Sequence, residues 1–266
     1  MTQFRTLELS HPRPGIALAT LNRPERLNAI TFEMFDEFGE LQGQIDGDPE
    51  TRVLVITGGG RGFCAGLDLD CAAQLPEMTA TKMMREQQKW GASVAGFRHM
   101  STPVVAAVNG PAAGAGMGLA LAADIRIAAD SARFNAAFVK VGLSGGDVGT
   151  SWALPRLVGL ARATEILLTG RFVSADEALQ IGLVTDVTSA DELLDRAYEI
   201  AEMIASNSPF GMTLTKQVIQ QNVDAPSLDA AIAVENRNQV LATRTSDMRE
   251  ALTAFREKRR PVFTGR

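Results

Sequence analysis

Residues 109–124 read Asn-Gly-Pro-Ala-Ala-Gly-Ala-Gly-Met-Gly-Leu-Ala-Leu-Ala-Ala-Asp, and no charged residue interrupts the run before its final aspartate. Four glycines, at positions 110, 114, 116 and 118, lie among alanines in this run. Glycine lowers helix stability by about 1 kcal/mol relative to alanine, so a segment this rich in glycine needs a reason. Free backbone N–H groups at a helix start offer one, because they can bind an oxygen that carries negative charge. We therefore expect a helix over 114–123 that begins on glycines.

Short strands alternate with helices on both sides of this run. Short segments rich in apolar and β-branched residues predict strands over 4–9, 15–21, 53–57, 103–108 and 124–128. The first two form a predicted hairpin whose turn spans 11–15, where two prolines precede a glycine. Apolar residues at helical spacing predict a helix from residue 31 to about 45. The run at 53–57 is rich in β-branched residues and uninterrupted by charge, and the run at 103–108 is similar, which is typical of parallel strands buried on both faces. This alternation predicts an α/β fold with right-handed crossovers.

Helical signals dominate after residue 150. Two Ser-x-x-Glu sequences, beginning at Ser174 and Ser189, have capping-box spacing and predict helix starts. A short strand over 183–187 is expected between them, and from about residue 209 the pattern is mostly helical. We therefore expect an α/β core over residues 1–200 and a helical C-terminal region over 201–266. This second region would pack on the core or on a neighbouring subunit.

Composition restricts the classes of function. The 266 residues carry a net charge of −5, which disfavours a nucleic-acid binder because such proteins need a basic surface. The opening segment has no cationic stretch followed by an apolar core, so no secretory signal is expected. No apolar run is long enough for a membrane span. The two cysteines form neither a disulfide framework nor a zinc-ligand pattern. We expect a cytoplasmic protein with no nucleic-acid partner, no membrane span and no metal.

A second glycine-rich segment, Gly58-Gly-Gly-Arg-Gly-Phe-Cys-Ala-Gly66, also follows a predicted buried strand. Neither segment has the spacing of a phosphate-binding P-loop or of a dinucleotide-binding motif. Two helix starts that face each other would offer two N–H donors to one oxygen, which is the arrangement of an oxyanion hole. A long turn without a ligand is the alternative for the second segment.

Three motifs, two of which overlap these glycine-rich segments, together resemble those of a known protein family. They are Leu21-Asn-Arg-Pro-Glu-Arg-Leu-Asn-Ala29, Phe63-Cys-Ala-Gly-Leu-Asp-Leu69 and Val108-Asn-Gly-Pro-Ala-Ala-Gly-Ala-Gly116. In this order and spacing they resemble the crotonase (enoyl-CoA hydratase/isomerase) superfamily, and the similarity covers nearly the whole chain. The resemblance implies a crotonase-like spiral of ββα turns with a helical C-terminal trimerisation region. It also implies a homotrimer or a dimer of trimers, that is, a hexamer.

The activity that the resemblance implies is that of an enoyl-CoA hydratase or isomerase, a lyase or isomerase of fatty acid metabolism. The ligand would be an acyl-CoA thioester, with no separate cofactor because coenzyme A is part of the substrate. The resemblance assigns the oxyanion donors to the backbone N–H groups of Leu67 and Ala115, which would hold the thioester oxygen as an enolate. It further implies contacts with CoA or the acyl group from Arg26, Leu27, Ala29, Ala65, Gly66, Asp68, Leu69, Gly114, Phe138 and Lys258. For Arg26 and Lys258 the alternative is a solvated surface charge.

Both glutamates that hydratases of this family use are replaced here. The resemblance places them at Gly118 and Phe138, and neither residue transfers a proton. Asp147 is the remaining candidate, since it matches the catalytic aspartate of the dienoyl-CoA isomerases and 4-chlorobenzoyl-CoA dehalogenases, although the other catalytic residues of both are missing. A carboxyl group among glycines and apolar neighbours would have a raised pKa, which suits general acid–base catalysis. The alternative role of Asp147 is the N-cap of a helix over 150–157.

Three functional hypotheses follow. The first is an enzyme of the hydratase/isomerase class that uses Leu67, Ala115 and Asp147. The second is a non-catalytic acyl-CoA-binding protein that has lost its acids, and the third is an acyl-CoA hydrolase or C–C lyase on the same scaffold. Cys64 is expected to be a buried thiol without a catalytic base. Asp124 is expected to cap a strand or to pair with an arginine. The sequence does not select the acyl group.

Overall fold

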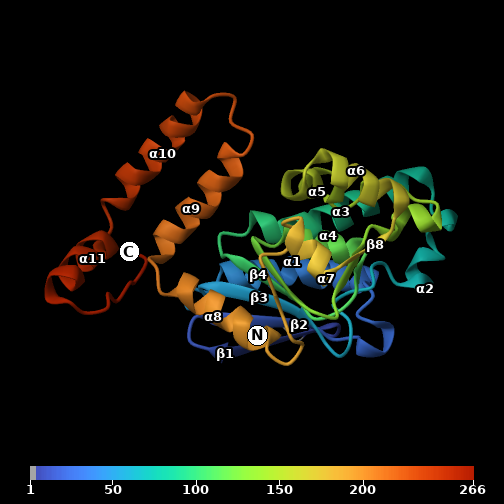
Figure 1. Cartoon of the computed structure of the whole chain (residues 1–266), viewed down its shortest axis with the longest axis horizontal. Coiled ribbons are helices and arrows are strands. Elements are labelled where there is room, and N and C mark those ends of the chain that lie inside the picture. The colour runs from blue at the N-terminus through green and yellow to red at the C-terminus, as the bar shows by residue number, and fades with distance from the viewer. Residues whose placement is uncertain (1–3) are drawn as a thin grey trace.

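The computed structural model describes residues 4–266 and has the alternation of strands and helices expected from the sequence (Figure 1). Residues 1–3, part of the opening segment where no secretory signal is expected, lie outside the described residues. The central sheet has the strand order β1-β2-β3-β4-β6-β9. Its strands are β1 (Leu7–Arg13), β2 (Ile16–Leu21), β3 (Val53–Gly58), β4 (Val104–Val108), β6 (Ile125–Ala129) and β9 (Asp186–Thr188). β1 and β2 are antiparallel, and the other neighbouring pairs are parallel.

A smaller sheet and the helices complete the fold. The smaller sheet contains β5 (Ala112–Ala113), β7 (Arg133–Asn135) and β8 (Phe172–Ser174). The helices of the body are α1 (Phe32–Asp46), α2 (Leu69–Ala72), α3 (Ala80–His99), α4 (Ala115–Ala122), α5 (Thr150–Val158), α6 (Leu160–Thr169), α7 (Ala175–Gln180) and α8 (Leu193–Ala205). Figure 1 shows α9 (Pro209–Asn222), α10 (Leu228–Ala242) and α11 (Ser246–Glu257) extending away from the sheet. Within residues 4–266 no helix combines the length and apolar character that crossing a membrane requires.

Alternate residues of the buried strands enter two different cores. In β3, Leu54 and Ile56 belong to the core that also contains residues of α1, α3 and α4. Val53 and Val55 belong to a second core, which is closed by α8. Because helices cover both faces of the sheet, its central strands β3 and β4 are buried at every position and mostly apolar. The predicted strands at 53–57 and 103–108 and the helices at 31–45 and 114–123 are confirmed within one or two residues.

The predicted hairpin turn is wrong by several residues. The turn is confined to Pro14 and Gly15, because β1 continues through Pro12 to Arg13. Proline cannot donate to a β-ladder, but β1 is an edge strand, and its pairing register shifts between Ser10 and Arg13. The edge position therefore allows a strand where the prolines predicted a turn.

Boundaries in the second half differ in a similar way. The strand predicted over 183–187 forms instead at Asp186–Thr188. The capping box at Ser174 is confirmed on its serine side, since Ser174 Oγ accepts the backbone N–H of Glu177. At Ser189 the prediction is wrong, because α8 begins at Leu193. The Ser189 hydroxyl donates to the Glu192 carboxylate at 2.7 Å, in a turn that precedes the helix.

A buried ion pair joins α9 to the end of the central sheet. The ammonium of Lys216 lies 2.8 Å from the Asp124 carboxylate and donates to the carbonyl of Thr102 at 2.9 Å. The same carboxylate accepts the N–H of Val104, so the expected strand cap at Asp124 is confirmed. Its charged partner is this lysine and not an arginine. The pair fixes the start of the C-terminal helices on the core.

Candidate functional site

The candidate site lies beyond the carboxyl ends of β3 and β4, at the edge where parallel strands leave their loops. The loop that follows β3 and the segment that leads into α4 run side by side here. The N–H of Cys64 donates to the carbonyl of Pro111 at 3.0 Å, and the N–H of Ala113 donates to the carbonyl of Cys64 at 2.9 Å. Glycine is required at position 116, because a Cβ there would overlap the Cys64 carbonyl oxygen. The two glycine-rich segments therefore form one tightly packed junction.

The backbone N–H of Leu67 points out of this junction. The carbonyl of Gly66 accepts the N–H of Ile30 at 2.7 Å, and Asp68 N–H donates back to the carbonyl of Ile30 at 2.9 Å. The Gly66 carbonyl and the Leu67 N–H belong to one planar trans peptide group, so they point in opposite directions. Within residues 4–266 the Leu67 N–H donates to no other residue. It is therefore available to a ligand.

The backbone N–H of Ala115 is the first amide of α4. The carbonyl of Gly114, in the same peptide group, accepts the N–H of Gly118 at 3.1 Å and so points along the helix. The Ala115 N–H must point the opposite way, out of the helix start, where amides have no partner in their own helix. In the part of the chain that the structure describes, no carbonyl or side chain accepts it.

Gly66, which precedes Leu67, packs against the start of α4. A Cβ placed on Gly66 would lie 2.8 Å from the carbonyl oxygen of Ala113 and 3.5 Å from the nitrogen of Ala115. Gly66 also has a φ of +92°, a conformation that glycine adopts readily. The free N–H groups of Leu67 and Ala115 therefore belong to two loops that pack against each other at the positive end of the α4 dipole. Such an arrangement can stabilise an oxygen atom that acquires negative charge.

Apolar side chains flank the start of α4 at both positions where hydratases were expected to carry glutamate. Phe138 lies in the turn Ala137–Val141 and is buried. A Cβ placed on Gly114 would be 3.6 Å from its ring. Gly118 is covered by Val148, since a Cβ there would overlap Val148 Cγ2. A proton carrier at this site therefore has to come from another element.

Asp147 lies in the loop over 142–149, next to Val148, and its carboxylate is directed toward α3. One oxygen, Oδ1, accepts the side-chain amide of Gln87 at 2.5 Å and the N–H of Val148 at 2.8 Å. The predicted N-cap role is wrong, because Gly149 occupies the N-cap of α5 and no side chain caps that helix. Burial raises the pKa of Asp147, and the two hydrogen bonds oppose the rise. The raised pKa of Asp147 agrees with the expectation from the sequence.

The loop that carries Asp147 is held in an uncommon backbone conformation. Val148 has a φ of +40°, in the left-handed region that a β-branched residue seldom adopts. Thr150 fixes this geometry, since its N–H donates to the carbonyl of Asp147 at 2.8 Å and its buried hydroxyl donates to the carbonyl of Gly145 at 2.9 Å. The same loop therefore sets the positions of both Asp147 and Val148.

The residues expected to contact CoA differ in their exposure to solvent. Arg26, Ala65 and Leu69 are exposed, and Arg26 makes only a surface contact of 3.4 Å with Asp70. Leu27 has a left-handed φ of +50°, whereas Ala29, Gly66 and Gly114 are buried. The N–H of Ala65 donates to the carbonyl of Leu27 at 3.0 Å. A ligand at Ala65 would thus meet its carbonyl or its methyl group.

Asp68 and Lys258, which were also expected to contact CoA, differ from the other residues in their surroundings. The Asp68 carboxylate is buried, accepts the N–H of Asp70 at 2.9 Å and pairs with Arg23 at 2.9 Å, so its charge is already neutralised within the protein. Lys258 is the C-cap of α11, which Figure 1 places far from α4. Within a single chain, Lys258 is therefore not part of the junction.

Asn28 organises the site in a way that the sequence did not indicate. Its side chain is fully buried and donates to the carbonyls of Gly59 and Gly62 at 2.9 and 2.8 Å. Its oxygen accepts the N–H of Arg23 at 3.0 Å. Asparagine tolerates the left-handed φ of +56° found here, and this residue lies inside the first quoted motif. Asn28 ties the turn at 23–29 to the loop that carries Leu67.

Cys64 is a buried thiol, as expected. Burial raises its pKa to about 12, so the thiolate needed for nucleophilic attack is not formed near neutral pH. Among residues 4–266 no group of three or more histidine, cysteine, aspartate or glutamate side chains is placed to hold a metal ion.

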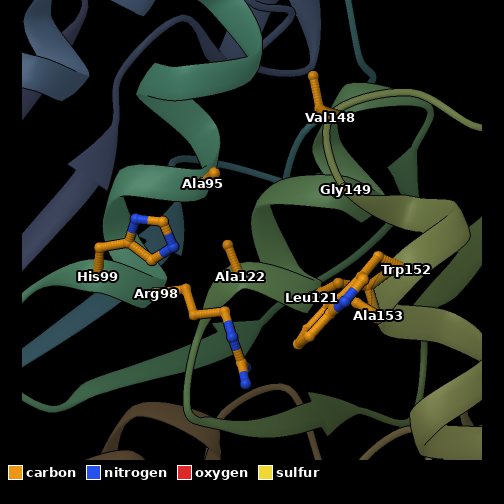
Figure 2. A pocket seen from close by; sticks show the side chains of 10 residues that line it. Ala95, Arg98, His99, Leu121, Ala122, Val148, Gly149, Trp152 and Ala153 are labelled. Atoms are coloured by element: carbon orange, nitrogen blue, oxygen red, sulfur yellow. The ribbon is translucent and has the colours of Figure 1, made fainter. Parts of the chain in front are cut away.

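A cavity of about 230 Å³ lies between α3, α4 and α5, next to the junction (Figure 2). Gly118 and Val148 are part of its wall, together with small apolar residues such as Ala122. Arg98 and His99 come from the end of α3, and Trp152 from α5. The Arg98 guanidinium lies 4.7 Å from the centre of the Trp152 ring, within the range of a cation–π contact. The cavity is therefore mainly apolar, with Arg98 and His99 on one side.

Comparison with known proteins identifies relatives over nearly the full length. Residues 12–266 match the sequence model of the family described as "Enoyl-CoA hydratase/isomerase". A Mycobacterium bovis protein named "Probable enoyl-CoA hydratase echA12" is 43% identical over 96% of this chain and 92% of its own. The 1,2-epoxyphenylacetyl-CoA isomerase of Escherichia coli is 42% identical over 97% of this chain and 98% of its own. A crystal structure of an enoyl-CoA hydratase from Bacillus anthracis superimposes with a TM-score of 0.93 at 34% identity, over 98% of this chain and 100% of that chain. These matches confirm the fold expected from the resemblance.

Proposed function

Because the chain belongs to the enoyl-CoA hydratase/isomerase family, we propose that it binds an acyl-CoA thioester and transfers a proton on the acyl group through an enolate. The observation that carries the proposal is the pair of free amides at Leu67 and Ala115, in two loops that pack against each other. The thioester oxygen would accept both N–H groups, which would stabilise the negative charge it gains in the reaction. One donor of this kind typically contributes roughly 100- to 1000-fold in rate.

Asp147 would carry the proton. Its carboxylate removes a proton from a carbon of the acyl group, and the C–H electron pair moves through the conjugated carbons to the thioester oxygen. The enolate collapses when the same carboxyl group returns the proton to a different carbon, so the double bond has moved and no atom is gained or lost. The raised pKa of Asp147 suits both steps, because a base that also acts as an acid works best near the ambient pH.

We favour isomerisation over hydration. Isomerisation needs one group that takes and returns a proton, whereas hydration also needs a group that activates water. The positions expected to carry the two hydratase glutamates hold Gly118 and Phe138, and Asp147 is the carboxylate next to Val148, which packs on Gly118. The E. coli relative is named an isomerase, which agrees with this assignment.

The apolar cavity next to Gly118 and Val148 would receive the far end of the acyl group. Its walls are mainly apolar, and its volume of about 230 Å³ is larger than the roughly 150 Å³ of an engineered cavity that holds benzene. The name of the E. coli relative also specifies an acyl group derived from phenylacetate, the ring epoxide 1,2-epoxyphenylacetyl. We therefore propose an aromatic or medium-length apolar acyl group as the substrate class.

Hydrogen exchange at carbon tests this proposal, whichever overall reaction the enolate serves. Purified protein is incubated with phenylacetyl-CoA or a 3-enoyl-CoA in D₂O, and mass spectrometry follows the uptake of deuterium at carbon. The wild type should catalyse exchange, and Asp147→Asn should lower the rate by about 100-fold or more while CoA thioester binding is retained. Asp191→Asn, on an exposed aspartate in the turn before α8, is the matched control. Exchange by Asp147→Asn at the wild-type rate would exclude Asp147 as the proton carrier.

The alternative function is acyl-CoA binding without catalysis, which the apolar residues at 118 and 138 favour. The same experiment separates the two functions. A wild-type protein that binds the thioesters tightly but catalyses neither exchange nor any change of product mass would support the binding protein. Release of free CoA or of a shorter acyl chain would instead support hydrolysis or C–C cleavage.

We also propose that the chain assembles as a homotrimer or a dimer of trimers. The C-terminal helices expose large apolar side chains, among them Leu228, Val240 and Phe255. Exposed apolar residues on an extended helical arm favour burial against another copy of the chain. Light scattering coupled to size-exclusion chromatography should give three or six times the monomer mass, and a monomer at micromolar concentration would contradict the assembly.

A further inference from the structure

One hydrogen bond in the site is not explained by the proposed reaction itself. Gln87, in the middle of α3, donates its side-chain amide to Asp147 Oδ1 at 2.5 Å, although the two residues are 60 positions apart. The side chains are both partly buried. The backbone N–H of Val148 donates to the same oxygen at 2.8 Å. Among the residues described, no group donates to the second oxygen, Oδ2.

This asymmetry distinguishes the two carboxylate oxygens. A carboxylate oxygen has two in-plane lone pairs, and on Oδ1 both are engaged by N–H donors. A proton that binds the carboxylate must therefore bind Oδ2, because binding at Oδ1 would displace a hydrogen bond. Gln87 cannot compete for that proton, since its amide does not titrate.

We propose that Gln87 is the positioning residue that holds Oδ1 against α3 and leaves Oδ2 as the atom that exchanges the proton with the acyl-CoA. This inference rests on the proposed role of Asp147. In the first step Oδ2 forms a bond to the proton as the C–H bond breaks, and the electron pair moves to the thioester oxygen. In the second step the O–H bond breaks and the proton returns to carbon. Gln87 keeps its hydrogen bond to Oδ1 throughout both steps.

Charged groups on the neighbouring elements do not replace this contact. The titratable and charged residues on the elements around the loop come from α3, the preceding turn, α5 and α6. They are Lys82, Arg85, Glu86, Lys89, Arg98 and His99 of α3, Lys140 of the turn, Arg156 of α5, and Arg162 and Glu165 of α6. Arg98 and Arg156 stack on Trp152, and Glu165 pairs with Arg171. Within residues 4–266 none of them forms an ion pair with Asp147. The neutral amide is thus the side chain that orients the carboxylate.

Two variants test the inference. Gln87→Met keeps the length and helix propensity of the side chain but removes the donor. We expect kcat for deuterium exchange into phenylacetyl-CoA to fall about 10- to 100-fold with little change in KM, as for loss of a hydrogen bond to a charged group. The acidic limb of the pH profile should move to higher pH, because the N–H group stabilises the charged form of Asp147. Gln87→Glu restores a donor only while the new carboxyl group is protonated, so activity should fall again as the pH rises.

Gln88→Met, on the exposed neighbour in the same helix, is the matched control and should leave both kcat and the pH profile unchanged. If Asp147→Asn is inactive while Gln87→Met keeps the wild-type kcat and acidic limb, the inference is wrong and the proposed function stands. If Asp147→Asn is fully active, the proposed function itself fails. If Gln87→Met does not fold, Gln87→Glu decides the question, since an unchanged pH profile in that variant contradicts the positioning role.

Discussion

Gly118→Ala is expected to destabilise this protein, although the same change in most helices is stabilising. Alanine is favoured over glycine in a helix interior by about 1 kcal/mol. At position 118, however, the added Cβ would overlap Val148 Cγ2 and approach the Val148 carbonyl oxygen to 3.3 Å. Overpacking of a buried site costs typically 1–3 kcal/mol. The expected net effect is a loss of about 0–2 kcal/mol from the free energy of unfolding.

The sign should reverse when Val148 is replaced by glycine. Val148→Gly removes the overlapping methyl group and relieves the left-handed backbone of a β-branched residue, which costs roughly 1–2 kcal/mol. It also loses a buried side chain worth about 1.5–3 kcal/mol. In this background Gly118→Ala keeps its helix-propensity gain and should stabilise the protein by about 0.5–1 kcal/mol. The coupling energy between the two positions is then about 1–3 kcal/mol.

Equilibrium urea unfolding of the four proteins, at one fixed protein concentration, measures this cycle. Gly91→Ala is the matched control, because Gly91 lies inside α3 with nothing within 4 Å of an added Cβ and should report the propensity gain alone. Equal effects of Gly118→Ala in the two backgrounds would refute the close packing of Val148 on Gly118. A Gly118→Ala single variant that is more stable than the wild type would also refute this packing.

Three further outcomes are expected. Burial raises the pKa of Asp147 above the ordinary value of an aspartate, so the folded state binds this proton more tightly than the unfolded state. The stability that this proton provides is present below the unfolded pKa of about 3.9 and is lost as the pH rises through the raised folded pKa. Asp147→Asn should therefore raise the midpoint of thermal unfolding at pH 7 but not at pH 3, and a lower midpoint at pH 7 would contradict this. Asn28→Ala should lower the free energy of unfolding by about 1–3 kcal/mol, because buried carbonyls lose their donor, whereas Asn22→Ala on an exposed residue should have no effect in the same urea titration. Ala122→Leu should fill the cavity and lower deuterium exchange into phenylacetyl-CoA by at least about tenfold, while exchange into butyryl-CoA is kept; equal loss with both thioesters would show that the cavity does not hold the acyl group.

The framework of the site could be predicted from the sequence because its signals are local. An apolar run followed by glycines indicates where a buried strand ends, and α4 begins at Ala115 as the glycine pattern predicted. Every residue of α4 is buried, which agrees with a run that carries no charge over its whole length. The adjacency of the loops at Leu67 and Ala115 follows from parallel strands that end at the same edge of the sheet.

The environment of Asp147 could not be predicted in this way. An aspartate close to the start of a predicted helix suggested an N-cap, and that prediction was wrong because Gly149 occupies the N-cap of α5. Two competing donors, the Val148 N–H and the Gln87 amide, take the carboxylate oxygen instead. The Gln87 contact depends on how α3 packs against the loop, and no local pattern contains it. Gln87 itself lies among other polar residues and carries no sequence signal of its own.

The proposed chemistry of the site depends on the loop over 142–149 more than on α4. Val148 covers Gly118, where the resemblance to hydratases expects a glutamate, and the neighbouring residue supplies the nearby carboxylate. The two facts are linked by backbone geometry, because the left-handed conformation at Val148 places its side chain on α4 while Asp147 turns toward α3. A larger residue at 118 would push Val148 away and move Asp147 with it. Glycine at 118 is therefore a condition for the position of Asp147, so the loss of one acid and the placement of the other form a single structural change.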